Sequence, residues 1–247
     1  MEQELWGKAG WVLTLCPAAR EAGGSFHGSV RSGGGVWQSE PDPARSRLVA
    51  AQRARRRFRL YCVGNQLTRL GTLTYPDPGC WDQGQLRADL GEFFRGVRTM
   101  LGGRPLPYAW VPEWHPGGHG LHAHFLLGRY VKRSIIKAAW KPGGHFWIEL
   151  IGDLPVGSGA FAEARRAAQY GAKYLKKAFE DERIAKRHRY DVAQGFQPLF
   201  EQVNRGTLER ALAECSRRLN GDDPAIVFRP DQEPGFTGPP SVWAQWN

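Results

Sequence analysis

Hydrophobic and polar positions alternate along some segments of the chain and recur at helical spacing along others. Period-two patterns bounded by Gly and Pro predict strands at residues 70–75, 108–114, 121–127 and 145–151. Helical spacing is clearest at 83–101, where the apolar positions are Leu86, Leu90, Phe93, Phe94, Val97 and Leu101. Further helices are predicted at 51–60, 132–140, 160–179 and 208–219. From residue 70 to residue 179 the predicted order is therefore β-α-β-β-α-β-α.

This order predicts an α+β fold, a mainly antiparallel sheet with helices packed on it, of the ferredoxin-like kind. Residues 1–48 are rich in Gly, Ser and Pro and are expected to form a poorly ordered extension, although Trp11-Val12-Leu13 has the character of a short strand. The core domain is expected at 49–200. Residues 201–247 are expected to form a C-terminal helix followed by a flexible tail.

Composition narrows the class of protein. The chain has 247 residues and a formal net charge of +10, which favours a polyanionic partner such as nucleic acid. Its four cysteines have neither zinc-site nor redox spacing, so they are expected to be free thiols. There is no secretory signal pattern at the start and no apolar run of membrane-spanning length, and we expect a cytoplasmic protein without a membrane partner.

One short segment gathers unusual chemistry. Four of the seven histidines lie between residues 115 and 124, directly after Glu113. Alternation places His122 and His124 on one face of a strand, and Glu113 and His115 on one face of the preceding strand. Gly and Pro residues at 116–120 supply the turn between them. Imidazole and carboxylate ligands suit a divalent cation such as Mn, Mg or Zn. Either acid or histidine from the first strand can complete the site.

The predicted helix at 160–179 carries two Tyr-x-x-Lys pairs. Tyr170 and Tyr174 are four residues apart, so they lie on one helix face, and they precede Lys173 and Lys177 by three residues each. A phenol is a poor nucleophile at neutral pH. It becomes effective toward a phosphate that is polarised by a cation, and a nearby ammonium stabilises the charge that develops. Such a helix over a metal site predicts a phosphodiester transesterase.

Three motifs in this order resemble those of rolling-circle replication initiators of the HUH endonuclease superfamily. They are Leu73-Thr74-Tyr75, Leu121-His122-Ala123-His124, and the segment from Tyr170 to Lys177. The last is similar to the two-tyrosine form found in gene A initiators of small isometric single-stranded DNA phages and in initiators of actinobacterial plasmids. The resemblance covers about residues 50–200.

The resemblance implies roles for these residues. His122 and His124 would be metal ligands, with Glu113 as the third ligand and His115 as its rival, and the ion would be Mn or Mg. Tyr170 and Tyr174 would be nucleophiles that form 5′-phosphotyrosine, alternating at one site while the origin is nicked and rejoined. Replacing either tyrosine alone by Phe should leave some nicking.

The substrate would be single-stranded or extruded origin DNA, with basic side chains on its phosphates: Arg53, Arg55, Arg56, Arg57 and Lys176. There is no phosphate-binding loop of an ATP motor, so a host helicase and polymerase are expected partners, and no small-molecule cofactor is expected. Two alternatives stay open. One is an RRM-like module that binds single strands without cutting them. The other is a relaxase or transposase of the same superfamily.

Overall fold

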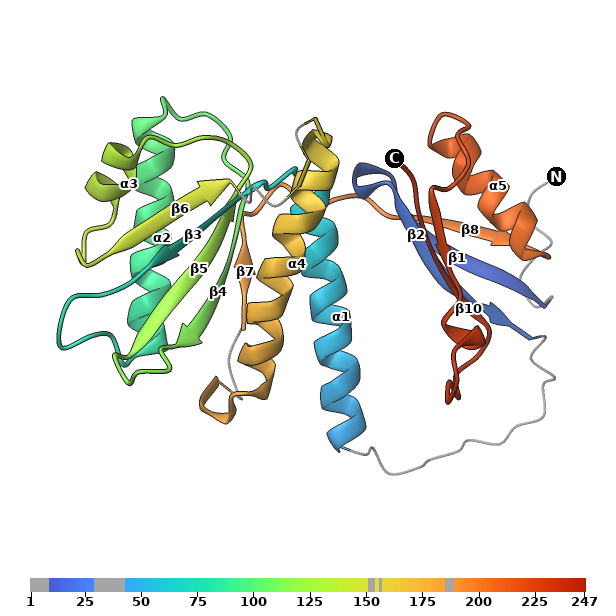
Figure 1. Cartoon of the computed structure of the whole chain (residues 1–247), viewed down its shortest axis with the longest axis horizontal. Coiled ribbons are helices and arrows are strands. Elements are labelled where there is room, and N and C mark those ends of the chain that lie inside the picture. The colour runs from blue at the N-terminus through green and yellow to red at the C-terminus, as the bar shows by residue number, and fades with distance from the viewer. Residues whose placement is uncertain (1–8, 29–42, 151–153, 156, 185–188) are drawn as a thin grey trace. The chain divides into compact units, whose positions relative to one another are not determined.

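The computed structural model describes residues 9–28, 43–150, 154–155, 157–184 and 189–247 (Figure 1). The chain divides into two compact units. One is continuous, Pro43–Gln197, and the other combines Met1–Asp42 with Pro198–Asn247. Each is built around its own five-stranded antiparallel sheet. The α+β class predicted from the sequence is confirmed.

In the continuous unit the strands are ordered β6-β3-β5-β4-β7. The bounds are β3 Arg69–Leu73, β4 Tyr108–Trp114, β5 Leu121–Leu127, β6 Phe146–Leu150 and β7 Asp191–Val192. Its helices are α1 Pro43–Gly64, α2 Gln83–Met100, α3 Arg133–Ala139, α4 Gly159–Glu180 and the short η2 Glu182–Ile184. The succession β3-α2-β4-β5-α3-β6 with β6 beside β3 and β5 between β3 and β4 is the ferredoxin-like arrangement.

Strand β5 is buried along its whole length because helices cover both faces of the sheet. Leu121, Ala123, Phe125 and Leu127 point to one face and join the core that α2 and α3 complete. His122, His124 and Leu126 alternate with them and point to the other face, on which α4 packs. Aromatic residues dominate the first core, where Phe93 contacts Phe94, Phe125 and Trp140 edge to face.

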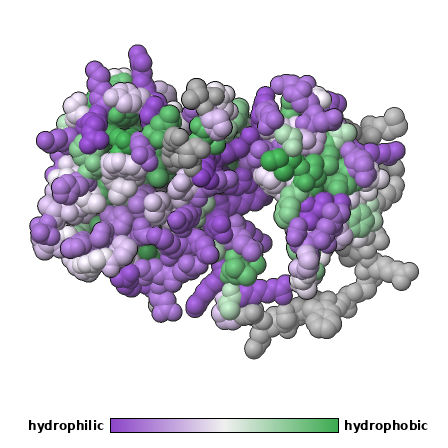
Figure 2. All heavy atoms as spheres, viewed as in Figure 1, coloured by the Kyte–Doolittle hydropathy of each residue, from purple (hydrophilic) through white to green (hydrophobic). Residues whose placement is uncertain are grey.

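Helix α4 is itself covered by α1, and Figure 1 shows the two helices side by side. They approach closely at Gly171, where a Cβ atom would lie 2.7 Å from Phe58 and 2.9 Å from Leu126. The absence of a side chain at this position therefore sets the distance of α4 from both α1 and β5. Figure 2 shows a hydrophilic surface over α1 and α4.

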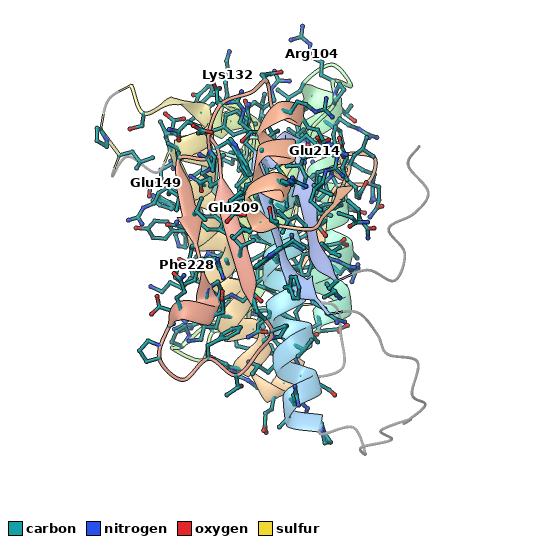
Figure 3. All side chains as sticks on the ribbon, turned by 90° about the vertical axis from the view of Figure 1, so that its right-hand side faces the viewer. Arg104, Lys132, Glu149, Glu209, Glu214 and Phe228 are labelled. Carbon is teal, nitrogen blue, oxygen red and sulfur yellow. The ribbon has the colours of Figure 1, made fainter. Side chains whose placement is uncertain are left out.

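The second unit has strands in the order β8-β1-β2-β10-β9. They are β1 Gly10–Cys16, β2 Glu21–His27, β8 Glu201–Arg205, β9 Ile226–Phe228 and β10 Ser241–Gln245. Helix α5, Leu208–Arg218, packs on β8 and β1, and the short helices η1 Pro17–Ala19 and η3 Pro230–Gln232 complete the unit. Glu214 projects from α5 (Figure 3) and pairs with Arg217 and Arg218 of the same helix and with Arg205 of β8.

The sequence-based expectation for the chain ends is corrected here. Residues 10–27, expected within a poorly ordered extension at 1–48, form two paired strands, and the expected flexible tail contains β9 and β10. Residues 1–8 and 29–42 of the expected extension lie outside the described residues. The reason is non-local pairing: β2 pairs with β10 from the opposite end of the chain, and the Gly-rich sequence Glu21–His27 carries little periodic signal.

Among the helices that the structure describes, none combines the length and the apolar character needed to span a membrane.

Candidate metal centre and tyrosine helix

Two neighbouring strands place an acid opposite a histidine. The hairpin of β4 and β5 pairs Glu113 with His122, and β3 pairs Thr72 with His124. Because side chains alternate along a strand, His122 and His124 both point to the α4 face, as the sequence predicted. The turn is closed by hydrogen bonds from the His115 N–H to Gly120 and from the Gly118 N–H to His115.

Three side-chain atoms converge at this face of the sheet. Glu113 Oε2 lies 2.7 Å from His124 Nε2 and 3.2 Å from His122 Nε2, and the two Nε2 atoms are 3.1 Å apart. Both imidazoles are buried. In the part of the chain that the structure describes, these three residues are the group of ligand-type side chains that could hold a metal ion.

Electrostatics favour the deprotonated, ligand-competent forms of the acid and of one histidine. Burial alone would raise the pKa of Glu113, but hydrogen bonds with His122, His124 and Lys177 outweigh it and hold that pKa well below its usual range. Burial lowers the pKa of His124, although the hydrogen bond with Glu113 opposes the shift. The pair therefore presents a carboxylate and a neutral imidazole at neutral pH.

The spacing of the three atoms fits a divalent cation. Donors about 2.1 Å from an ion and at right angles to one another lie about 3.0 Å apart, close to the observed separations. Thr72 Oγ1 is 3.0 Å from His124 Nδ1, so an Nδ1–H donated to this hydroxyl leaves the Nε2 lone pair directed at the cluster. Lone pairs that converge in this way repel one another, and a bound cation relieves that repulsion.

Helix α4 brings one tyrosine directly onto this cluster. The ring of Tyr174 stacks on the ring of His124, with centroids 3.5 Å apart and planes inclined by 15°. One turn later, the Lys177 ammonium donates to Glu113 Oε1 at 2.7 Å and lies 5.4 Å from the centroid of the Tyr174 ring. Burial and then the charge of Glu113 raise the pKa of Tyr174, and Lys177 opposes that shift.

The second tyrosine lies one turn earlier on the same helix. The Arg166 guanidinium is 5.1 Å from the centroid of the Tyr170 ring. Tyr170 is close enough to Tyr174 to contribute to the rise in its pKa. The two phenols are thus neighbours, and Tyr174 is stacked on a residue of the cluster.

The remaining predicted site residues are exposed basic side chains. Lys173 and Lys176 project from α4, and Lys176 lies 3.7 Å from Glu180. Arg53, Arg55, Arg56 and Arg57 are on α1, with most of them exposed. None of these belongs to the Glu113–His122–His124 cluster.

Two features of the cluster differ in their visibility from the sequence. His115, the rival to Glu113, has its Nδ1 atom occupied by the Gly117 N–H at 3.0 Å, and it contributes no atom to the cluster. Thr72, which orients His124, was not identified by sequence reasoning. The available signal was its place in a Thr-rich predicted strand, and strand register cannot be read from that pattern.

The chain was compared with protein families, curated proteins and solved structures. Residues 68–179 match the family described as Replication-associated protein ORF2. Neither the curated proteins nor the solved structures contain a match. The matched segment includes the whole Glu113–His122–His124 cluster and both tyrosines of α4. The chain therefore carries a domain of the Replication-associated protein ORF2 family, a replication initiator of the rolling-circle type.

Proposed function

We propose that this protein initiates rolling-circle replication by nicking and rejoining single-stranded origin DNA through a covalent phosphotyrosine. The observation that carries the proposal is the stacking of Tyr174 on His124, within a donor set suited to a divalent ion. A nucleophile and a metal centre that come from a helix and a sheet far apart in sequence meet at one place. A family match to replication-associated proteins supports origin DNA as the substrate.

Glu113, His122 and His124 would hold the ion, Mn or Mg by the chemistry of the family. When bound, a divalent ion would draw electron density from a substrate phosphate and neutralise charge that develops on it. Lys177 complements this role. Its ammonium balances the charge of Glu113 in the resting protein and lies close enough to the Tyr174 ring to favour the phenolate.

In the proposed step the Tyr174 phenol oxygen attacks the phosphorus, and the bond from phosphorus to the 3′-oxygen breaks. The phenol proton passes to solvent, and the departing 3′-oxygen takes up a proton. The number of phosphodiester bonds is unchanged, so the step needs no energy source and is reversible. Reversal by a new 3′-hydroxyl rejoins the strand.

We assign the first cleavage to Tyr174 and the second to Tyr170. Tyr174 stacks on the cluster, whereas Tyr170 lies one turn away with its ring against Arg166. A second phenol within one helical turn can attack the regenerated origin while the first still carries the old 5′ end. Lys173 would serve Tyr170 as Lys177 serves Tyr174.

The arginines of α1 and Lys176 of α4 are proposed to contact the phosphates of the strand. Binding should then weaken steeply as salt rises, because each neutralised phosphate releases counterions. A host helicase and polymerase would act on the nicked duplex. Relaxases and single-strand transposases share the chemistry, but a tyrosine pair that follows the histidines favours the initiator.

The test is adduct formation on single-stranded DNA cut from the replicon that encodes the protein. With Mn²⁺, the wild type should give a covalent complex on a denaturing gel, Tyr174→Phe should lose most of the first cleavage, and Tyr170→Phe should nick but rejoin poorly. Clean recovery of uncut DNA, with binding intact, would instead favour a non-catalytic single-strand-binding module.

A further inference from the structure

A cavity lies close to the metal hairpin in the continuous unit. It has a volume of about 590 Å³ and is formed by the loop after β3, the first turns of α2 and the turn after α3. Its walls include Tyr75, Trp81, Asp89 and Lys141. This volume is within the range of small-ligand pockets, and none of these residues takes part in the proposed cleavage.

Trp81 gives the cavity an exposed aromatic wall. The indole is 59% exposed, although its N–H donates to the Pro78 carbonyl at 2.9 Å and its ring packs against Trp114 at 5.8 Å between centroids. The ring is thus held in place by its edge and one neighbour while much of its surface stays in water. An exposed, anchored indole on a basic protein suits the π-face of an unpaired base.

Asp89 gives the cavity a fixed hydrogen-bond acceptor. Its carboxylate accepts from the Tyr75 hydroxyl at 2.7 Å and from the Gln85 amide at 2.8 Å, one bond to each oxygen. Burial and the hydrogen bond to Asp89 raise the pKa of Tyr75, so this phenol remains a donor. Each carboxylate oxygen retains further lone-pair capacity. The Lys141 side chain adds a positive charge at the rim.

The cavity is tied to the metal hairpin by the backbone. The Leu121 N–H, one residue before His122, donates to the Cys80 carbonyl at 2.7 Å. Gly79 and Gly120 permit this approach: both have positive φ, and a Cβ atom on either would lie 2.5 Å from a backbone oxygen of the other segment. Trp114, which supports Trp81, is the neighbour of Glu113 in β4.

We propose that this cavity is a subsite for one unpaired base of the DNA strand next to the cleaved phosphate, an inference that rests on the proposed function. Trp81 stacks on the base, Asp89 accepts from its exocyclic amine, and Lys141 contacts the phosphate. A carboxylate pairs well with the amine of cytosine, adenine or guanine. Thymine has no amine, and carbonyl oxygens flank its single ring N–H, so the subsite discriminates against it.

The test measures DNA binding without cleavage. Tyr174→Phe protein in EDTA is titrated with labelled twelve-nucleotide strands of deoxycytidine, deoxyadenosine or thymidine, and binding is followed by fluorescence anisotropy. We expect thymidine to bind about fivefold more weakly, as one lost hydrogen bond to a charged acceptor implies. Adding Trp81→Ala should weaken binding of all three strands roughly 5- to 100-fold, the range for one lost stacking contact.

Two matched substitutions control for loss of an exposed indole and of a negative charge. Trp147→Ala removes an exposed indole from β6, and Asp77→Asn makes the same charge change as Asp89→Asn within the neighbouring loop. Neither side chain lines the cavity. Asp89→Asn should abolish the preference against thymidine, whereas Asp77→Asn should keep it. Circular dichroism melting establishes that each variant is folded.

The proposal is overturned if Trp81→Ala binds like Trp147→Ala, or if Asp89→Asn keeps the preference. Failure of the cleavage chemistry gives a different result. If the wild type forms no adduct with Mn²⁺ while the base preference persists and depends on Asp89, the subsite stands and the nuclease assignment falls. If the wild type forms the adduct but Asp89→Asn leaves the base preference unchanged, the nuclease assignment stands and the subsite falls.

Discussion

Gly171 offers a direct test of the packing that places Tyr174 at the metal centre. In Gly171→Ala the new methyl group would lie 2.7 and 2.9 Å from two carbon atoms of Phe58 and 2.9 Å from Leu126. Both neighbours are completely buried, so neither ring nor methyl group can turn into solvent. Helix α4 must therefore shift away from α1 or from the sheet.

The magnitude follows from two opposing effects. Overpacking a tight core costs about 1–3 kcal/mol, and replacing Gly by Ala inside a helix gains about 1 kcal/mol. The net expectation is a destabilisation of about 0–2 kcal/mol. The effect on chemistry should be larger, because Tyr174 is on the next turn of the same helix, and a displacement of about 1 Å can lower a rate about 100-fold.

Gly91→Ala in α2 is the matched control. A Cβ atom there would meet only the flexible guanidinium end of Arg95, at 3.3 Å. This variant should gain about 0.5–1 kcal/mol and keep full activity. Both glycines are in the same unit. Urea unfolding of the full chain therefore compares them in one transition, and adduct formation on single-stranded DNA gives the rates.

The reasoning is refuted if Gly171→Ala is stabilised as much as Gly91→Ala, since that would mean the close contacts do not exist. It is also refuted if Gly171→Ala is destabilised but forms the adduct at the wild-type rate. In that case the position of α4 would not control the reaction.

Other substitutions probe the charges and hydrogen bonds of the molecule. Lys177→Met should bind Mn²⁺ more tightly by calorimetry, because the ammonium no longer competes for Glu113, yet it should form the adduct on the order of 100-fold more slowly; equal rates would contradict its role. Thr72→Val removes the partner of His124 Nδ1 and should weaken Mn²⁺ binding about 10- to 100-fold with little change in melting temperature. Hydrogen bonds from two arginines of α5 lower the pKa of Glu214 to about 2. Its stabilising contribution is therefore complete above pH 4.5 and declines as the pH falls toward 2, so melting temperatures of wild type and Glu214→Gln should differ at pH 6 and converge as the pH approaches 2; a constant difference would exclude this linkage.

The core elements were predictable from the sequence because their hydrophobic periodicity is strong. The strand predicted at 121–127 and the helix predicted at 83–101 match β5 and α2 to within a residue. Period two also placed His122 and His124 on one face without further information. The pairing of Glu113 with His122 followed from a hairpin whose turn residues are evident.

Long-range features were not predictable in the same way. Strand β2 contains Gly23 and Gly24, lacks a clear alternation, and finds its partner β10 more than 200 residues later. The contact of Thr72 with His124 depends on the register of β3 against β5, and that of Tyr174 with His124 depends on the packing of α4. Register and helix docking are tertiary properties, which local periodicity does not encode.

The most direct test of the central claim is mass spectrometry of the covalent complex. The protein is incubated with single-stranded origin DNA and Mn²⁺, digested with trypsin, and searched for a nucleotide-linked peptide of α4. We predict a 5′-phosphodiester on Tyr174, lost when EDTA is present and when His124 is replaced by Ala. DNA linked to a residue outside α4, or a Tyr174 linkage that forms equally well without metal, would contradict the account.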